Sequence, residues 1–289
     1  MSGGFHLAGI VPVAGQSLDF NMPWHDSLMP IAQNYLAVER AVIECAYAGC
    51  ETIWVVCNDD MQPLIRHRLG DYVQDPVWIN RTFEMRRSEK RKPVPIYYVP
   101  ILPRDRNKRD CLSFSIIHGS WMAKKVCGSL STHLKPDMNY VAFPYGVYHI
   151  SKVREHRKDI SSNRPFFLSH NGRTVIDGEY LGFSVLPSKV RDLAIEIAEK
   201  STGIYADAER TKKLPIEERY SYRNFKLEQV FDSLTLKGAK VHELDRYWRI
   251  DSWEDYKKYM AVEKTHIRRP SKALMSYKEW NGIGVDDIE

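Results

Sequence analysis

The pattern of hydrophobic and polar positions in the first part of the chain predicts strands separated by a helix. Residues 7–13 form an apolar run long enough for one buried strand, and the Ala14-Gly15 pair that follows permits a tight turn. Residues 36–46 place apolar side chains at helical spacing, and Gly49 follows as a helix cap. Residues 52–57 are β-branched and apolar, which predicts a second strand. These elements make a βαβ unit, in which the two strands run parallel.

Strand and helix patterns continue to alternate along most of the remaining chain. We expect helices at residues 61–72, 111–126, 150–157, 188–200 and 225–236, and strands at residues 95–101, 139–147, 179–186 and 240–244. Asn171-Gly172 lies between two apolar runs and predicts a hairpin turn. The alternation predicts an α/β protein with a mostly parallel sheet. We expect one domain over residues 1–262 and a C-terminal tail or arm over residues 263–289.

Composition narrows the class of protein only a little. The chain has 289 residues, of which 43% are hydrophobic and 27% are charged, and these are ordinary globular values. Its net charge of +5 is mild, so we expect no specific nucleic-acid partner. The five cysteines lack any C-x-x-C pair, which predicts reduced, buried thiols. No apolar run reaches 18 residues and no signal segment is evident, so we expect a cytoplasmic protein without a membrane partner.

Three stretches carry a resemblance to a known family. Residues 10–15 read I-V-P-V-A-G, residues 25–31 read H-D-S-L-M-P-I, and residues 44–49 read E-C-A-Y-A-G. This wording resembles the sugar-nucleotide nucleotidyltransferases, most closely the glucose 1-phosphate uridylyltransferases, over about residues 5–262. The resemblance implies a three-layer α/β/α sandwich with a mostly parallel central sheet, the GT-A-like fold of that family. It also implies that the glycine loop, formed here by Val13, Ala14, Gly15, Gln16 and Ser17, binds the nucleotide.

The chain differs from the family at the positions where the family has its phosphate-binding cations and its metal-binding aspartate. Ser17 and Asp19 lie in the stretch where the family has G-T-R, and His25-Asp26 replaces its Pro-Lys pair. The fourth strand ends in Pro144-Tyr145-Gly146, where the family has an aspartate that binds Mg²⁺. Asp19 and Asp26 in place of two cations would repel a triphosphate unless a metal or other basic residues intervene. An acid–base pair of His25 with Asp26 is disfavoured, because adjacent loop residues rarely face one another.

Four further residues are candidates for a ligand role. Arg106 and Arg109 precede the helix at residues 111–126, and the resemblance places such residues near the nucleotide; the alternative is surface charge. Gly182 matches a glycine that lies against the sugar, and the alternative is close packing in a strand. Asp251, in the segment Y-W-R-I-D-S-W-E-D-Y, matches a magnesium ligand of the family, and the alternative is that it caps a helix. Mg²⁺ is the only cofactor that this reading implies.

The remaining patterns leave the function open between three classes. The first is an enzyme that transfers a nucleotidyl group to a sugar phosphate with Mg²⁺ at Asp251. The second is a catalytically inactive protein of the same fold, with a binding or structural role in a larger assembly, as the likeness of residues 23–31 to phage-encoded homologues implies. A glycosyltransferase is third, because no D-x-D motif is present. The ten histidines lack H-x-x-x-H spacing, which argues against zinc.

Two segments are candidates for contacts with other molecules. The basic segment at residues 81–109 is either a solvated loop or a contact for a polyanion. The C-terminal tail is a candidate for docking on a protein partner through Met275 and Trp280. We expect the small-molecule partner to be a nucleotide or a sugar phosphate.

Overall fold

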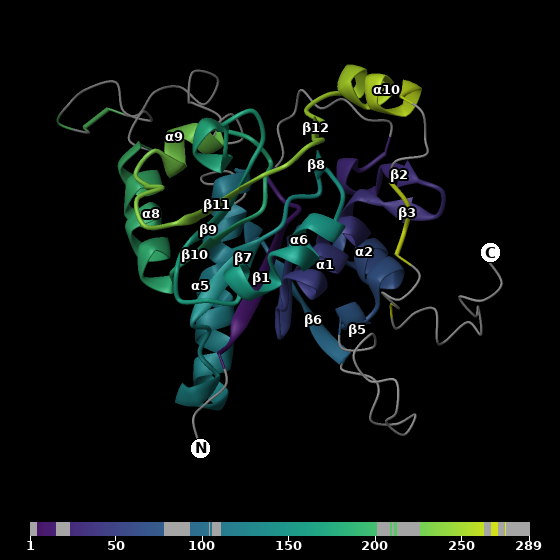
Figure 1. Cartoon of the computed structure of the whole chain (residues 1–289). Coiled ribbons are helices and arrows are strands. Elements are labelled where there is room, and N and C mark those ends of the chain that lie inside the picture. Colours follow the sequence, from purple (N-terminus) through teal and green to yellow (C-terminus); the bar gives the residue numbers. More distant parts are fainter. Residues whose placement is uncertain are drawn as a thin grey trace, which may run out of the picture.

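Figure 1 shows the computed structural model of the chain. It describes residues 5–15, 24–77, 93–103, 105, 111–200, 209, 211–212, 226–262, 267–270 and 275, with side chains omitted at 198–200. Several sequence predictions fall outside these residues: those for Gln16, Ser17, Arg106, Arg109, Trp280 and the 81–92 part of the basic segment.

The first predicted strand lies in the middle of the central sheet. β1 (Leu7–Pro12) runs parallel to β4 (Thr52–Cys57) on one side and to β7 (Met138–Val141) on the other. Ile10 is opposite Trp54 of β4 and Val141 of β7. Every residue of β1 is buried, as expected of a strand that is covered on both faces. The predicted βαβ unit is therefore confirmed.

In the described part of the chain the central sheet has eight strands in the order β11-β9-β10-β7-β1-β4-β6-β5. The outer strands are β5 (Tyr72–Gln74), β6 (Pro93–Pro100), β9 (Phe166–Ser169), β10 (Phe183–Val185) and β11 (Lys240–Glu243). β6 continues the parallel arrangement beside β4, and β11 runs parallel to β9. β5 and β10 are antiparallel to their neighbours. The sheet is thus mostly parallel, as predicted.

Helices cover both faces of this sheet (Figure 1). On one face, α1 (Ala37–Ala48) lies so close to β1 that a Cβ at Gly9 would be 2.8 Å from the Cys45 Sγ. On the other face, α5 (Leu112–Leu130) brings Gly119 against Ile10 and Val56. Further helices are α2 (Gln62–Leu69), α6 (Ser151–Glu155), α7 (Arg157–Ile160), α8 (Pro187–Lys200) and α9 (Leu227–Phe231). This is the expected three-layer α/β/α sandwich.

Several predicted elements differ in their bounds from the observed ones. The strand predicted at residues 139–147 ends at Val141, and the strand predicted at residues 179–186 begins only at Phe183. The helix predicted at residues 150–157 is divided into α6 and α7. α5 continues to Leu130, beyond the predicted end at residue 126. α9 ends at Phe231, whereas the pattern predicted a helix to residue 236. The hairpin prediction is confirmed, because Asn171 and Gly172 have φ values of 52° and 74°. A 3-10 turn, Val175–Asp177, then precedes β10.

Small strand pairs lie beyond the C-terminal ends of the parallel strands (Figure 1). β8 (Gly146–Val147) pairs with β12 (Trp248–Arg249), and α10 (Trp253–Ala261) follows β12. A second pair joins β2 (Pro30–Ala32) to β3 (Tyr35–Leu36). These segments bring residues distant in sequence to the edge of the sheet where a ligand site was expected.

Part of the predicted tail packs against the domain. Met275 is fully buried and makes an antiparallel bridge with Val73 of β5, and Ile267 is also buried. Met275 is therefore not exposed for docking on a partner. The domain boundary at residue 262 stays a prediction. None of the helices in the described part of the chain is long and apolar enough to cross a membrane.

Candidate functional site

Tyr145 joins the C-terminal ends of β1 and β7. Its hydroxyl donates to the backbone oxygen of Val13 at 3.1 Å and lies 3.3 Å from the Asp26 carboxylate. The side chain is fully buried, and burial, together with Asp26, raises the pKa of Tyr145 well above its usual value. The phenol therefore stays protonated and acts as a hydrogen-bond donor. Tyr145 lies four residues beyond the end of β7, in the stretch 144–146 where the resemblance implies an aspartate, and this correspondence stays a prediction.

The predicted turn at Gly15 is present, with a φ of +83° that favours glycine. A Cβ at this position would overlap the carbonyl group of Cys111, the residue that caps α5. The N–H groups of Val13 and Ala14 both donate to the Val56 oxygen at 2.9 Å. These two groups hold the turn against β4 and are not available to a ligand. A nucleotide role for this turn stays a prediction, which rests on Gly15 and the residues beyond it.

His25 and Asp26 face one another, contrary to expectation. The His25 Nδ1 lies 3.1 Å from the Asp26 Oδ1, because a 3-10 turn, Asp26–Leu28, begins at this point and His25 caps it. The Ser27 N–H also donates to Asp26 at 2.7 Å. Burial raises the pKa of Asp26 above its usual value. The carboxylate is therefore shielded from solvent and partly compensated by its neighbours.

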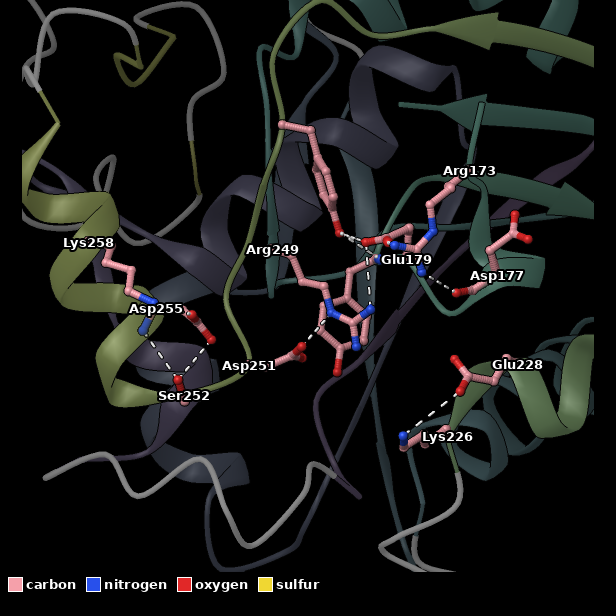
Figure 2. A network of polar contacts seen from close by, with 12 residues as sticks. Arg173, Asp177, Glu179, Lys226, Glu228, Arg249, Asp251, Ser252, Asp255 and Lys258 are labelled. Carbon is pink, nitrogen blue, oxygen red and sulfur yellow. Dashed lines mark hydrogen bonds and ion pairs between the residues drawn. The ribbon is translucent and has the colours of Figure 1, made fainter. Parts of the chain in front are cut away.

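Arg249 of β12 lies between two carboxylates at this edge of the sheet. Figure 2 shows its guanidinium paired with Asp251 and, at 3.6 Å, with Glu179. Glu179 is buried and also pairs with Arg173 at 2.9 Å. The guanidinium lies 5.1 Å from the centre of the Tyr180 ring. Two cations and two carboxylates thus form one network, whose formal charges cancel.

This network is attached to β8 and to Tyr145, which precedes it. Arg249 is opposite Gly146 in the β8–β12 pair, and the Ile250 N–H donates to the Tyr145 oxygen at 3.0 Å. A Cβ at Gly146 would overlap the Tyr180 carbonyl oxygen, so the backbone segments at Gly146 and Tyr180 are in close contact. Asp251 is therefore connected through Tyr145 to the turn that contains Gly15. The sequence predicted this association from the resemblance, but nothing in it pointed to Glu179 or Arg249.

Gly182 lies against a buried cluster of oxygen atoms. A Cβ there would overlap the Tyr140 hydroxyl and would lie 2.7 Å from the Glu44 Oε1. Glu44 is fully buried in α1, accepts a hydrogen bond from Tyr140 at 2.6 Å and another from Tyr148, and pairs with Arg40 at 2.8 Å. The close-packing alternative therefore accounts for the glycine. Its role in sugar binding stays an untested prediction.

No family model and no curated protein matches the sequence. A candidate glucose-1-phosphate thymidylyltransferase from Bacillus anthracis, solved in complex with sucrose, superposes with a TM-score of 0.53. It is 9% identical, and the match covers 92% of this chain and 98% of that one. The chain has the sugar-nucleotide nucleotidyltransferase fold.

Two other solved structures are similar at lower scores. A UDP-glucose pyrophosphorylase complexed with UDP-glucose has a TM-score of 0.48 at 10% identity, with 88% of this chain and 97% of that chain covered. Rv0371c from Mycobacterium tuberculosis H37Rv has a TM-score of 0.45 at 10% identity, over 89% of this chain and 97% of that chain.

The residues around Asp251 fit a resident Mg²⁺ poorly. Its carboxylate is paired with Arg249, which an ion would have to displace. In the part of the chain that the structure describes, Asp251 belongs to no set of three or more His, Cys, Asp or Glu ligand atoms. The helix-cap alternative does not account for Asp251 either. Ser252 is the cap of α10, since its Oγ accepts from the Asp255 N–H at 3.2 Å. Mg²⁺ stays an untested prediction for this nucleotidyltransferase fold.

A groove of about 1370 Å³ lies between α5 and α8, and its lining includes no residue of the Arg249 network. Phe114, His118 and Trp121 stack along α5 within it, with neighbouring ring centres 5.8 Å and 6.3 Å apart. Its cationic lining residues are Lys124, Lys125, Lys135 and Arg191. Sequence reasoning missed this groove, although the aromatic residues recur at the spacing of one helix face.

Proposed function

We propose that this chain binds a sugar phosphate or a sugar nucleotide beside Arg249 and Asp251, and that it does not transfer a nucleotidyl group. The observation that carries the proposal is the position of Tyr145. Tyr145 is a buried phenol with a raised pKa in the stretch where the resemblance implies a carboxylate, which supports the view that a metal at Asp251 would lack a second carboxylate ligand there. In-line transfer to a phosphate depends on such a metal and on cations around the reacting phosphorus.

The charge balance of the network favours a sugar over a triphosphate. Arg173 and Arg249 are offset by Glu179 and Asp251, so this network lacks the net positive charge that a triphosphate needs, and the sugar part of the ligand is what it would contact. A carboxylate accepts hydrogen bonds from hydroxyl groups, and a guanidinium group donates hydrogen bonds to them. A sugar has several hydroxyl groups. Asp251 and Arg249 are 36% and 35% exposed in their side chains and are therefore accessible to a ligand. The guanidinium of Arg249 lies over the ring of Tyr180.

Calorimetry on the whole chain tests this proposal. We expect glucose 1-phosphate or UDP-glucose to bind with equal affinity with and without Mg²⁺, and no pyrophosphate to be released when UTP, CTP or dTTP is added with glucose 1-phosphate. Asp251→Ala should weaken binding by about tenfold, the effect of losing one hydrogen bond to a charged group. Asp192→Ala is the control, because this carboxylate is exposed on α8.

A second candidate function is nucleotidyl transfer with Mg²⁺ at Asp251. The observation in its favour is the connection of the segment of Asp251 through Tyr145 to Val13 beside the Gly15 turn, since the resemblance implies that these two parts lie together. Micromolar binding of a nucleoside triphosphate that requires Mg²⁺, is abolished by Asp251→Ala and is accompanied by pyrophosphate release would establish it and refute our proposal. If none of these compounds binds, both ligand-binding proposals fail, and a structural role in an assembly is supported.

A further inference from the structure

His156, Asp159 and His242 meet at the edge of the central sheet, away from the Arg249 network. His156 lies between α6 and α7, Asp159 lies in α7, and His242 lies in the edge strand β11. One ligand atom from each residue lies within 4.8 Å of the others, and all three side chains are partly exposed. In the described part of the chain, no other group of three or more His, Cys, Asp or Glu residues has this spacing.

Two of these ligand atoms already have the spacing of metal ligands. The His242 Nε2 lies 3.2 Å from the Asp159 Oδ2. Ligands placed at the usual Zn–N and Zn–O distances around a tetrahedral ion are about 3.3 Å apart. The other carboxylate oxygen, Oδ1, pairs with the Lys240 ammonium. Lys240 therefore orients the carboxylate and leaves Oδ2 directed at His242, which is the role of an outer-shell partner in metal sites.

His156 can serve as the third ligand only after its side chain rotates. The rings of His156 and His242 are stacked, with centroids 3.6 Å apart and planes 25° apart. A metal lies in the plane of each imidazole that binds it, so the stacked rings cannot both bind one ion as they stand. His156 is partly exposed at the junction of two short helices, and its ring can turn about its side-chain bonds toward Oδ2.

Charges around the group set the kind of ion that fits. Lys240 pairs with Asp159, and Lys152, which acts electrostatically on His156, is itself paired with Glu155 and Asp245. Two imidazoles and one carboxylate match the donor set of Zn²⁺ and related transition metals. Mg²⁺ prefers oxygen ligands throughout and would gain little from two nitrogens.

We propose that His156, Asp159 and His242 bind a transition-metal ion such as Zn²⁺, with water as the remaining ligand. Such an ion would connect the edge strand β11 to the α6–α7 junction, two parts of the chain that are far apart in sequence. It would be separate from the sugar site and independent of its function.

Titration of the whole chain with Zn²⁺ after treatment with a chelator tests the proposal. We expect one ion per chain by calorimetry and a higher thermal midpoint when Zn²⁺ is present, because the ion binds the folded state. His242→Ala and His156→Ala should each weaken binding by about tenfold or more and abolish the thermal shift. His118→Ala is the matched control, since His118 also stacks on aromatic rings, but on α5.

Co²⁺ as a probe distinguishes this site from the five cysteines, all of which are buried. We expect visible absorption of a nitrogen and oxygen site, without the charge-transfer absorption of a thiolate. If His242→Ala fails to fold, His156→Ala alone decides the outcome, because its ring is partly exposed. The proposal is overturned if Zn²⁺ does not bind, if both variants bind like the wild type, or if the Co²⁺ spectrum shows thiolate ligands.

Discussion

The hydroxyl of Tyr145 donates a hydrogen bond to the backbone oxygen of Val13, and this contact joins the ends of two parallel strands. The bond is buried, and the same hydroxyl lies beside Asp26. Tyr145 therefore connects three segments of the chain, at Val13, Asp26 and Tyr145 itself, that are separated in sequence.

Tyr145→Phe should lower the free energy of unfolding by about 1–3 kcal/mol, because it leaves a buried backbone oxygen without its donor. Urea denaturation measures this change. Tyr97→Phe, at an exposed position on β6, is the control and should change stability by less than about 0.5 kcal/mol. Equal effects of the two substitutions would show that the Tyr145 bond contributes nothing measurable.

Gly182→Ala should destabilise the fold by about 1–3 kcal/mol, since the new methyl group would overlap the Tyr140 hydroxyl and approach Glu44. Thermal or urea unfolding measures the loss. In Gly128→Ala the nearest atom is the flexible end of Lys135, at 2.8 Å, and alanine is the better helix former. We therefore expect this control to leave stability unchanged or higher, and an unchanged stability of Gly182→Ala would refute the packing role.

Glu44→Ala should cost about 3–5 kcal/mol, because it leaves Arg40 buried without its carboxylate partner. Arg40 is held in place by that carboxylate, by the Phe143 oxygen and by the Tyr148 ring beneath it. The comparison is Lys189→Ala, which removes one partner of the exposed pair with Asp192 and should cost less than about 1 kcal/mol. A loss for Glu44→Ala no larger than that of Lys189→Ala would contradict the prediction.

The stability contribution of Asp26 should depend on pH. Burial raises the pKa of Asp26 in the folded state above its unfolded value near 3.8, so the folded chain binds this proton more tightly than the unfolded chain does. The charged form is therefore unfavourable in the folded state at neutral pH, and this penalty disappears as the pH falls through the raised pKa. Asp26→Asn should be more stable than the wild type at pH 7, and the difference should vanish below about pH 4.

Urea unfolding of the Asp26→Asn variant at several pH values provides the measurement. Asp71→Asn, a mostly exposed aspartate, is the control and should show no such trend. If Asp26→Asn is less stable than the wild type at neutral pH and the two become equal in acid, the contacts with His25 and Ser27 outweigh burial, and the sign of the prediction is wrong.

Much of the fold could be predicted because local patterns decide it. The apolar run of β1, the helical spacing of α1 and the glycine after it each depend on residues close together in sequence. The lengths of α5 and α9 could not be predicted well, because packing against neighbouring elements decides where a helix ends. His25 and Asp26 face one another because of a 3-10 turn that their own residue types did not indicate.

The candidate site could be predicted less fully. The resemblance led to the Gly15 turn and to Asp251, and the structure connects them through Tyr145. Glu179 was not foreseen, because its ion pairs come from residues on two other segments. Arg40 and Glu44 did carry a signal, since opposite charges four residues apart lie on one helix face.

The sequence by itself determined the order of most strands and helices, the parallel βαβ start and the absence of cations at positions where the resembling family has them. These follow from side-chain periodicity, from turn-forming residues and from residue identity, all of which are local properties. Only the tertiary structure decided that Arg249 neutralises Asp251, that Tyr145 donates a hydrogen bond to Val13, and that His156 and His242 meet. Such contacts depend on which strands become neighbours in the sheet, and the packing of the whole chain sets that order.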